Sequence, residues 1–304
     1  MAHTHRYGYA CINMELAEQK VVTNRGIQLK TFEREGLPRC SELALLNLTD
    51  LYTLLKWNID NNILVYRMSS QLFPWMTEYS LEDLPKWHRL KLKLEDIGDY
   101  VKGKDIRLSF HPGPYNNLGS PRDDVVAKSI VELEAHSKIM DYMGLPANHW
   151  SKINIHLGGS YGDKEATIAR FIKNFPRCSD NLRARFTLEN DDRESLYSVG
   201  DLVKVHESTG VPIVFDGHHW EVGAKSGSYR EDMLAAYRTW PSGIVPTLHW
   251  SNSRKEYEDS NSKINALTDR YFKTMPLPNL DCDVMLESKM KERALIKYLE
   301  GMQR

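Results

Sequence analysis

Histidine and acidic residues follow a series of short apolar segments along this chain. Six consecutive segments rich in β-branched or aliphatic residues each end in an imidazole or a carboxylate. Such a mixed set, without thiolates, is typical of sites for Zn²⁺ or Mn²⁺ and too rich in nitrogen for Ca²⁺ or Mg²⁺. The residues are His111, His156, Glu189, Asp216 with His219 just beyond it, His249 and Glu287.

The chemistry of this set depends on whether its members meet. A single strand-end histidine or aspartate is more often a capping residue than a ligand, but six successive strands with such ends indicate a multinuclear metal site. Glu189, Asp216 and Glu287 can each bridge two ions. Two ions about 3.5–4 Å apart activate a water and neutralise phosphate charge. Metal pairs in barrels also isomerise sugars, so the residues alone leave both reactions open.

The elements that must position these residues alternate between strands and helices. Amphipathic segments at 41–57, 123–145, 163–175 and 230–240 separate several apolar runs. This alternation predicts an α/β protein with a parallel sheet, and eight units favour a (β/α)₈ TIM barrel, in which all the strand ends converge on one face. We expect one domain over residues 1–304, with a core at about 6–300. The candidate strands are 6–12, 62–68, 105–111, 152–157, 184–190, 211–216, 244–250 and 281–287.

Bulk composition excludes some partners. Lysine and arginine number 40 against 41 aspartates and glutamates, so any binding to nucleic acid needs a local basic patch. No apolar stretch is long enough to span a bilayer, and the start MAHTHRYGYA lacks the apolar block of a signal peptide. We therefore expect a soluble intracellular protein, in the cytoplasm or nucleoid if the source is bacterial or viral. Four separated cysteines suggest neither a zinc cluster nor a disulfide framework.

The order of the motifs resembles that of the UV damage endonuclease family, TIM-barrel relatives of endonuclease IV. The similarity runs from about Tyr7 to Leu295. It implies catalytic roles for Glu189, Glu287 and Asp216, and metal ligation by the seven residues given above. The motifs that carry it are GYACIN (8–13), VYRMSSQLFPW (65–75), FHPGPYNNLGSPR (110–122), INIHLGG, LEND, FDGHHW, LHWS and DVMLESKMKERAL.

The same resemblance implies a function. We expect a metal-dependent DNA repair endonuclease that nicks the backbone 5′ to UV photoproducts, pyrimidine dimers and 6-4 photoproducts, leaving a 3′-hydroxyl and a 5′-phosphate. Its cofactors would be two or three divalent ions, Mn²⁺ first, with Zn²⁺ or Mg²⁺ as alternatives. Its partner would be double-stranded DNA containing UV lesions, bound by a monomer, with no membrane. The implied DNA or lesion contacts are Tyr9, Asn13, Arg67, Ser69, Ser70, Pro114 and Tyr115.

Two positions depart from the family pattern. Thr247 stands where the family commonly has lysine, and no histidine follows His249, where the family usually has one. Asp259 or Asp269 is a candidate substitute for that histidine. The departures leave open a weakened metal position, an altered metal preference, or reduced activity.

Other interpretations stay open on the same barrel: an apurinic-site endonuclease, and a xylose-isomerase-like sugar isomerase or epimerase. The two departures add a third, a damage-binding protein with impaired catalysis. His218 stays open as well: it either supports the ligands by hydrogen bonding or is exposed to solvent.

Overall fold

The computed structural model describes residues 3–302, and within them one parallel sheet of eight strands forms the centre of the molecule. Its strand order is β3-β2-β1-β8-β7-β6-β5-β4. A bridge between Phe110 and Ile153 brings the two outer strands together, so that the sheet closes into a barrel. The strands are β1 (His5–Ala10), β2 (Val65–Arg67), β3 (Arg107–Ser109), β4 (Ile153–His156), β5 (Phe186–Glu189), β6 (Ile213–Asp216), β7 (Thr247–Trp250) and β8 (Cys282–Leu286).

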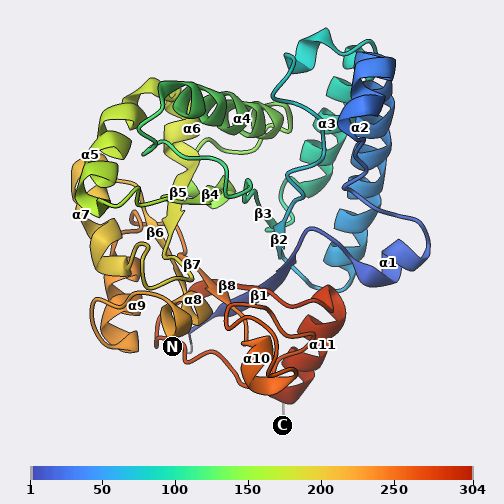
Figure 1. Cartoon of the computed structure of the whole chain (residues 1–304). Coiled ribbons are helices and arrows are strands. Elements are labelled where there is room, and N and C mark those ends of the chain that lie inside the picture. The colour runs from blue at the N-terminus through green and yellow to red at the C-terminus, as the bar shows by residue number, and fades with distance from the viewer. Residues whose placement is uncertain (1–2, 303–304) are drawn as a thin grey trace.

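Helices surround this sheet on its outer side (Figure 1). The predicted (β/α)₈ barrel is therefore confirmed, with one irregular unit: the connection from β7 to β8 carries only the short α10 within the described residues. The α-helices are α1 (Met14–Glu18), α2 (Leu29–Asp60), α3 (Trp87–Val101), α4 (Asp123–Tyr142), α5 (Lys164–Asn174), α6 (Asp180–Arg185), α7 (Val199–Thr209), α8 (Gly217–Val222), α9 (Tyr229–Arg238), α10 (Arg254–Tyr257) and α11 (Lys291–Met302).

Several strands are shorter than the apolar runs that predicted them. Cys11, Asn62 and Asp105 have φ angles of 68°, 55° and 54°. A positive φ is incompatible with extended structure. Hence β1 stops at Ala10, and β2 and β3 begin only after the turns at Asn62 and Asp105. None of them is a glycine. Asparagine and aspartate adopt positive φ more readily than most residues, whereas Cys11 carries no such local signal.

Helix positions follow their local signals closely. Side chains of Asp163, Ser198 and Ser228 cap α5, α7 and α9, the last two in capping boxes. The expected helix at 41–57 proves longer, because α2 begins at Leu29. It kinks at Gly36, whose φ is 58°, just before Pro38.

Apolar and polar cores occupy different sides of the sheet. The main hydrophobic cluster lies between the strands and the helices, whereas the barrel interior holds only a small one of Ala10, Val65 and Met285. Along β4, Lys152 and Asn154 are buried on the strand face that also bears His156, because residues i and i+2 share a face. The barrel interior is therefore largely polar.

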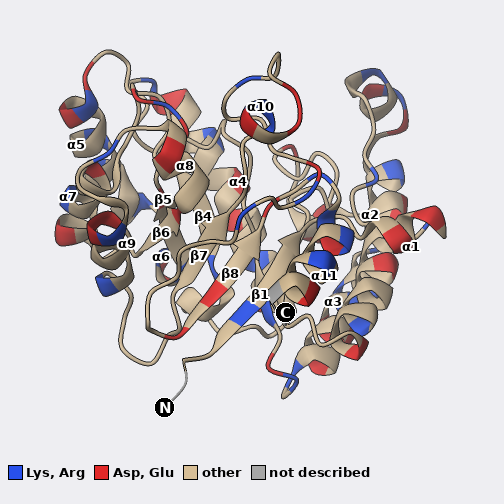
Figure 2. Ribbon diagram, turned by 90° about the horizontal axis from the view of Figure 1, so that it is seen from below, with Lys and Arg blue, Asp and Glu red and all other residues tan. Residues whose placement is uncertain are grey.

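Charges are mixed over the helices, with blue and red residues interspersed (Figure 2). In this view α8 and α10 stand above the carboxyl ends of the strands, at the end opposite the N-terminus. None of the helices within residues 3–302 is long and apolar enough to cross a membrane.

Candidate metal centre

Glu189, the last residue of β5, is the centre of the candidate site. Its carboxylate is 1% exposed and lies 3.0 Å from His111 Nε2 and 3.1 Å from His249 Nδ1. The Asn154 amide also donates to Glu189 Oε2, and Thr187 Oγ1 holds that amide by donating to its oxygen over 2.8 Å. The chain thus fixes one buried carboxylate among imidazoles that come from other strand ends of the barrel.

Two groups of potential ligands meet at this carboxylate. His111, His156 and Glu189 form one, and Glu189, Asp216 and His249 form the other, with the ligand atoms of each group within 4.8 Å of one another. Because Glu189 belongs to both, it is placed to bridge two ions. The structure thus brings together five of the predicted ligands around one shared carboxylate.

Two ring nitrogens in this cluster are placed better for a metal ion than for hydrogen bonds to the neighbouring carboxylates. His249 Nδ1 is buried and lies 3.1 Å from Glu189 and 3.3 Å from Glu287, yet it makes no aligned hydrogen bond within residues 3–302. His156 Nδ1 is likewise without an aligned partner there. Atoms that converge without hydrogen-bond alignment are what a shared cation would organise, and the nitrogen and oxygen donors suit a divalent transition metal.

Asp216 and His219 come from the FDGHHW segment. Asp216 ends β6 and caps α8, accepting a hydrogen bond from His219 N at 2.8 Å. Gly217 permits this tight turn, because a Cβ there would lie 2.7 Å from Trp250 and from the Tyr229 hydroxyl. His219 Nδ1 lies 3.3 Å from Glu189 and 3.0 Å from Asn190 O, so this imidazole is oriented by backbone as well as by carboxylate.

Glu287 lies just past the end of β8 and is held by arginine. Arg67 Nη1 and Nη2 donate to its two carboxylate oxygens at 2.6 and 3.2 Å. A predicted DNA contact and a predicted metal ligand therefore form a bidentate pair. This pair places a positive charge next to the ligand cluster, at the wall of the cavity described below.

Electrostatics keep these carboxylates ionised. Burial disfavours the charged form of Glu189, but His249, His111 and His156 hold its pKa well below the usual range. Burial likewise opposes ionisation of Glu287, and Arg67 lowers its pKa to about 2. For His219, burial is outweighed by Asp216 and Glu189, which raise its pKa to about 9. The anions of the cluster thus favour positive charge among them, whether as a proton on His219 or as a bound cation.

Asp191 is a site residue that the sequence analysis missed. Its Oδ1 lies 3.5 Å from His156 Nδ1, and burial raises its pKa to about 6. It follows Glu189 by two positions in LEND, beyond the strand end, so the strand-end pattern did not select it. A carboxylate next to a ligand histidine orients the ring and increases its basicity.

An open cavity of about 610 Å³ lies over this cluster. Arg67, Pro114 and Asp191 line it together with five of the predicted ligands, His111, His156, Glu189, His219 and Glu287. Tyr115, the next residue along the loop, is 88% exposed and projects from the surface. The cavity floor thus consists of carboxylates and imidazoles, and the Arg67 guanidinium lies in its wall.

Other residues implied by the resemblance lie behind this surface. Tyr9 and Asn13 are buried, at 0% and 1% exposed; the Tyr9 hydroxyl donates to Asn58 over 2.7 Å and accepts from Asn13 over 3.0 Å. Ser69 Oγ accepts from Gln71 N at 3.2 Å, and Ser70 Oγ donates to His111 O at 3.1 Å. These contacts shape the loops that carry the site.

The departures from the family pattern are visible in the structure. Thr247 is fully buried below His249 on β7, and its hydroxyl has no hydrogen-bond partner in residues 3–302. Asp259 bonds to Ser262, and Asp269 lies 3.4 Å from Arg254. Neither aspartate belongs to the two ligand groups or lines the cavity, so the structure brings neither into the site.

His218 is fully buried, which makes the solvent-exposed alternative wrong. Neither ring nitrogen has a hydrogen-bond partner among the described residues. Its ring centroid lies 6.3 Å from that of His219, and within residues 3–302 the structure shows no hydrogen bond by which it supports a ligand.

Comparison with known proteins agrees with this geometry. A putative UV-damage endonuclease of Acanthamoeba polyphaga mimivirus is 33% identical and covers 96% of this chain and 89% of its own length. The UV DNA damage endonuclease of Clostridium perfringens is 31% identical, with 98% of this chain and 70% of that protein covered. The UV-damage endonuclease of Schizosaccharomyces pombe is 35% identical over 96% of this chain, which spans 50% of that protein.

Solved structures extend the comparison. The crystal structure of SacUVDE superimposes with a TM-score of 0.84 at 29% identity, covering 99% of this chain and 98% of that one. A D-tagatose 3-epimerase-like protein shares the fold alone, with a TM-score of 0.57 at 11% identity. The family model described as UV-endonuclease UvdE matches residues 5–304. The chain therefore belongs to the UvdE family of UV endonucleases.

Proposed function

We propose that this protein nicks double-stranded DNA 5′ to UV photoproducts, leaving a 3′-hydroxyl and a 5′-phosphate, and that it depends on two or three divalent ions, Mn²⁺ first. The observation that carries the proposal is the convergence of two ligand groups on Glu189 beneath an open cavity. Family membership supports the substrate, because the relatives are named for UV-damaged DNA.

The ligand set divides between two positions that share Glu189. His111 and His156 would hold one ion and Asp216 and His249 the other. When bound, such ions supply an activated water and neutralise the charge of the phosphate. His219 and Glu287 adjoin both groups and are the candidates for completing the coordination.

Protein side chains position the DNA around this centre. Arg67 carries a guanidinium in the cavity wall, and its pairing with Glu287 fixes the orientation of that guanidinium. Tyr115 is our candidate for the side chain that enters the DNA stack; it is exposed and directly follows Pro114, whose ring restrains the backbone of the loop. Holding a stack open costs a few kcal/mol, and a distorted photoproduct offsets part of that cost.

The decisive experiment is incision of a duplex oligonucleotide containing one thymine dimer in the presence of Mn²⁺. Products are sized and their ends tested with polynucleotide kinase and ligase. Cleavage immediately 5′ to the dimer, with a ligatable 5′-phosphate, is expected. An undamaged duplex and the Glu189→Gln variant are the controls, and both are expected to stay uncut.

Three other outcomes would overturn the assignment in different directions. Cutting of an abasic duplex with the dimer duplex intact supports the apurinic-site interpretation. Tight binding of the dimer duplex with full metal loading and no cleavage supports a damage-binding protein, for which the unpartnered Thr247 hydroxyl is the motivating feature. Turnover of a ketose without DNA binding supports the sugar enzyme.

A further inference from the structure

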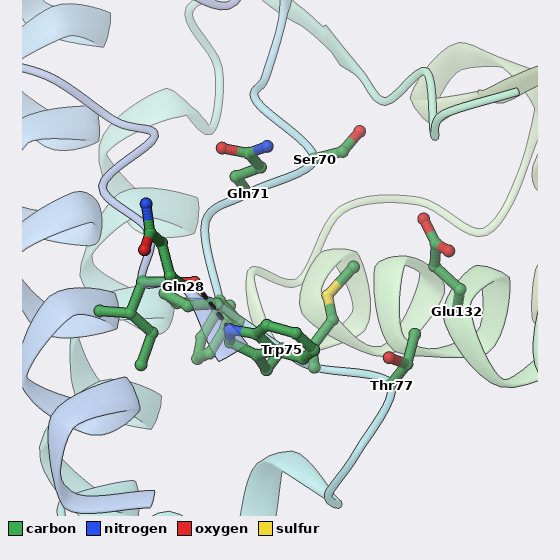
Figure 3. A pocket seen from close by; sticks show the side chains of 11 residues that line it. Gln28, Ser70, Gln71, Trp75, Thr77 and Glu132 are labelled. Atoms are coloured by element: carbon green, nitrogen blue, oxygen red, sulfur yellow. Dashed lines mark hydrogen bonds between the residues drawn. The ribbon is translucent and has the colours of Figure 1, made fainter. Parts of the chain in front are cut away.

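A second cavity, of about 480 Å³, opens next to the candidate metal centre. Two segments form it, residues 26–28 before α2 and residues 70–77 after β2, and Glu132 of α4 closes the far side (Figure 3). Its volume lies within the ~300–1,000 Å³ of sites that hold small molecules. None of its lining residues belongs to the ligand cluster of the metal centre.

Trp75 gives this cavity a rigid, flat apolar surface. Its indole Nε1 donates to Ile27 O over 2.9 Å, and its ring stacks on Phe32 with centroids 5.1 Å apart and planes 13° from parallel. Its φ angle is 60°, a left-handed conformation that is strained for a bulky residue. Such strain persists only where surrounding contacts enforce it, and it is common at binding sites.

Polar groups surround the indole on several sides. Figure 3 shows the side chains of Gln28, Gln71 and Glu132 around it, each from a different segment. Neither glutamine amide makes a side-chain hydrogen bond within residues 3–302. An amide offers a donor and an acceptor side by side, which matches the paired donors and acceptors on the edge of a nucleobase.

This cavity lies close to the loop at 112–116, which carries Tyr115. Thr77 and Glu132 line both this cavity and a neighbouring one that Tyr115 and Asn116 border. Ser70, at the rim, donates its hydroxyl to His111 O over 3.1 Å. The loop at 112–116 thus faces the metal centre on one side, with Pro112 to Pro114, and the Trp75 side with Tyr115.

We propose that the Trp75 cavity receives one unstacked nucleobase of the lesion duplex, which leaves the helix when Tyr115 enters it. Trp75 offers the surface on which the base stacks, and the Gln28 and Gln71 amides bond to its edge. The inference rests on the proposed function and deepens it, because it gives the displaced base a place to bind. Stacking on an aromatic surface is tolerant of sequence, so the cavity would accept different bases.

The test is single-turnover incision of the thymine-dimer duplex at increasing protein concentrations. It yields the half-saturating concentration and the maximal rate separately. Gln28→Ala/Gln71→Ala, at two exposed positions, is expected to raise the half-saturating concentration about tenfold, the effect of losing one good edge contact, and to leave the maximal rate within about twofold. Gln19→Ala, an exposed glutamine outside this cavity, is the matched control and is expected to behave as wild type.

A change in the DNA identifies the base. Two kinds of duplex are compared, each with one nucleotide that lacks its base. In one kind this nucleotide lies opposite the dimer in the intact strand, and in the other it lies next to the dimer in the damaged strand. Where the missing base is the one that enters the cavity, its absence is expected to raise the half-saturating concentration of wild type about tenfold. The half-saturating concentration of the double variant is expected to stay the same with and without that base. The duplex that shows this non-additivity assigns the strand.

Two results would overturn the inference. One is a double variant with the wild-type half-saturating concentration on the intact dimer duplex. The other is a tenfold rise in the half-saturating concentration of the double variant that adds to the effect of every missing base. That result would mean that the glutamines contact the DNA backbone instead of a base. Failure of wild type to cut the dimer duplex at all is a separate result, since it rejects the proposed function and this inference with it.

Discussion

Two buried charged clusters lie at opposite ends of the same barrel. The lower cluster consists of Arg6, Arg107 and Asp283, at the amino-terminal ends of the strands, and the upper cluster is the ligand set around Glu189. In the lower cluster Asp283 accepts from Arg6 Nε at 2.7 Å and from Arg107 Nη1 at 2.9 Å. Arg107 also donates to the carbonyls of Trp150, Val245 and His149 at 2.6–2.9 Å.

The upper cluster is close in space but incompletely bonded. Within residues 3–302, His156 Nδ1 and His249 Nδ1 have no aligned partner, although carboxylate oxygens lie 3.5 Å or less away. A buried polar network whose members are all satisfied is structural, whereas one left unsatisfied marks a place for a ligand. The difference in hydrogen bonding therefore separates the two roles better than charge or burial does, because both clusters are charged and buried.

The largest expected effect is at the upper cluster. Glu189→Gln keeps the shape of the side chain but removes the charge that both ligand groups share, so we expect incision to fall by on the order of 10⁴-fold. Mn²⁺ is expected to raise the melting temperature of wild type but not of this variant. Glu165→Gln, at an exposed position on α5, is the control for both measurements. Incision retained within tenfold would reject the bridging role.

The lower cluster is expected to affect stability instead. Asp283→Asn removes the charge that pairs two arginines and leaves Arg107 buried, so urea denaturation should show a loss of about 3–5 kcal/mol. The matched control is Asp105→Asn, because Asp105 also pairs with Arg6 but is 70% exposed. We expect the Mn²⁺ affinity of folded Asp283→Asn to equal that of wild type. A large loss of metal affinity in this variant would mean that the lower cluster also supports metal binding, which would contradict the separation of the two roles.

Asp191 tests the edge of the upper cluster. Asp191→Asn retains the size of the side chain and weakens its hold on His156, so metal affinity or activity should fall by about 10–100-fold. Titration of the metal-free protein with Mn²⁺, followed by incision at saturating metal, separates the two effects. Asp180→Asn, at a position 92% exposed, serves as the control. If neither metal affinity nor incision changes, Asp191 has no role in positioning His156.

Lys152, between the two clusters, gives the smallest expected effect and one that depends on pH. Burial, with the positive charge of Arg107, holds the pKa of Lys152 well below its usual range. The unfolded chain therefore binds a proton that the folded chain does not, so stability falls as pH drops below the unfolded value of about 10.4. Lys152→Met is expected to add about 1–2 kcal/mol at pH 7 and to flatten stability between pH 7 and 10. A steeper pH dependence in the variant would contradict this.

The sequence predicted which histidine and acidic residues follow the strands, but it did not predict the exact first and last residues of each strand. Residue type at each strand end singled out the ligand set because parallel strands of a barrel must end on one face. Strand limits depended instead on positive φ angles at Cys11, Asn62 and Asp105; asparagine and aspartate tolerate such angles, but only the structure shows where they occur. His218 shows the same limit, because the sequence left its exposure open and only the structure shows that it is buried.

The sequence by itself determined the barrel, the family and the residues that could hold metal, because periodicity and residue type are local properties. The tertiary structure alone decided that Arg67 pairs with Glu287, that Asp191 adjoins His156, and that the loops before α2 and after β2 enclose a cavity around Trp75. Each of these joins segments far apart in the chain. Their contacts arise only when the barrel closes, which no local pattern records.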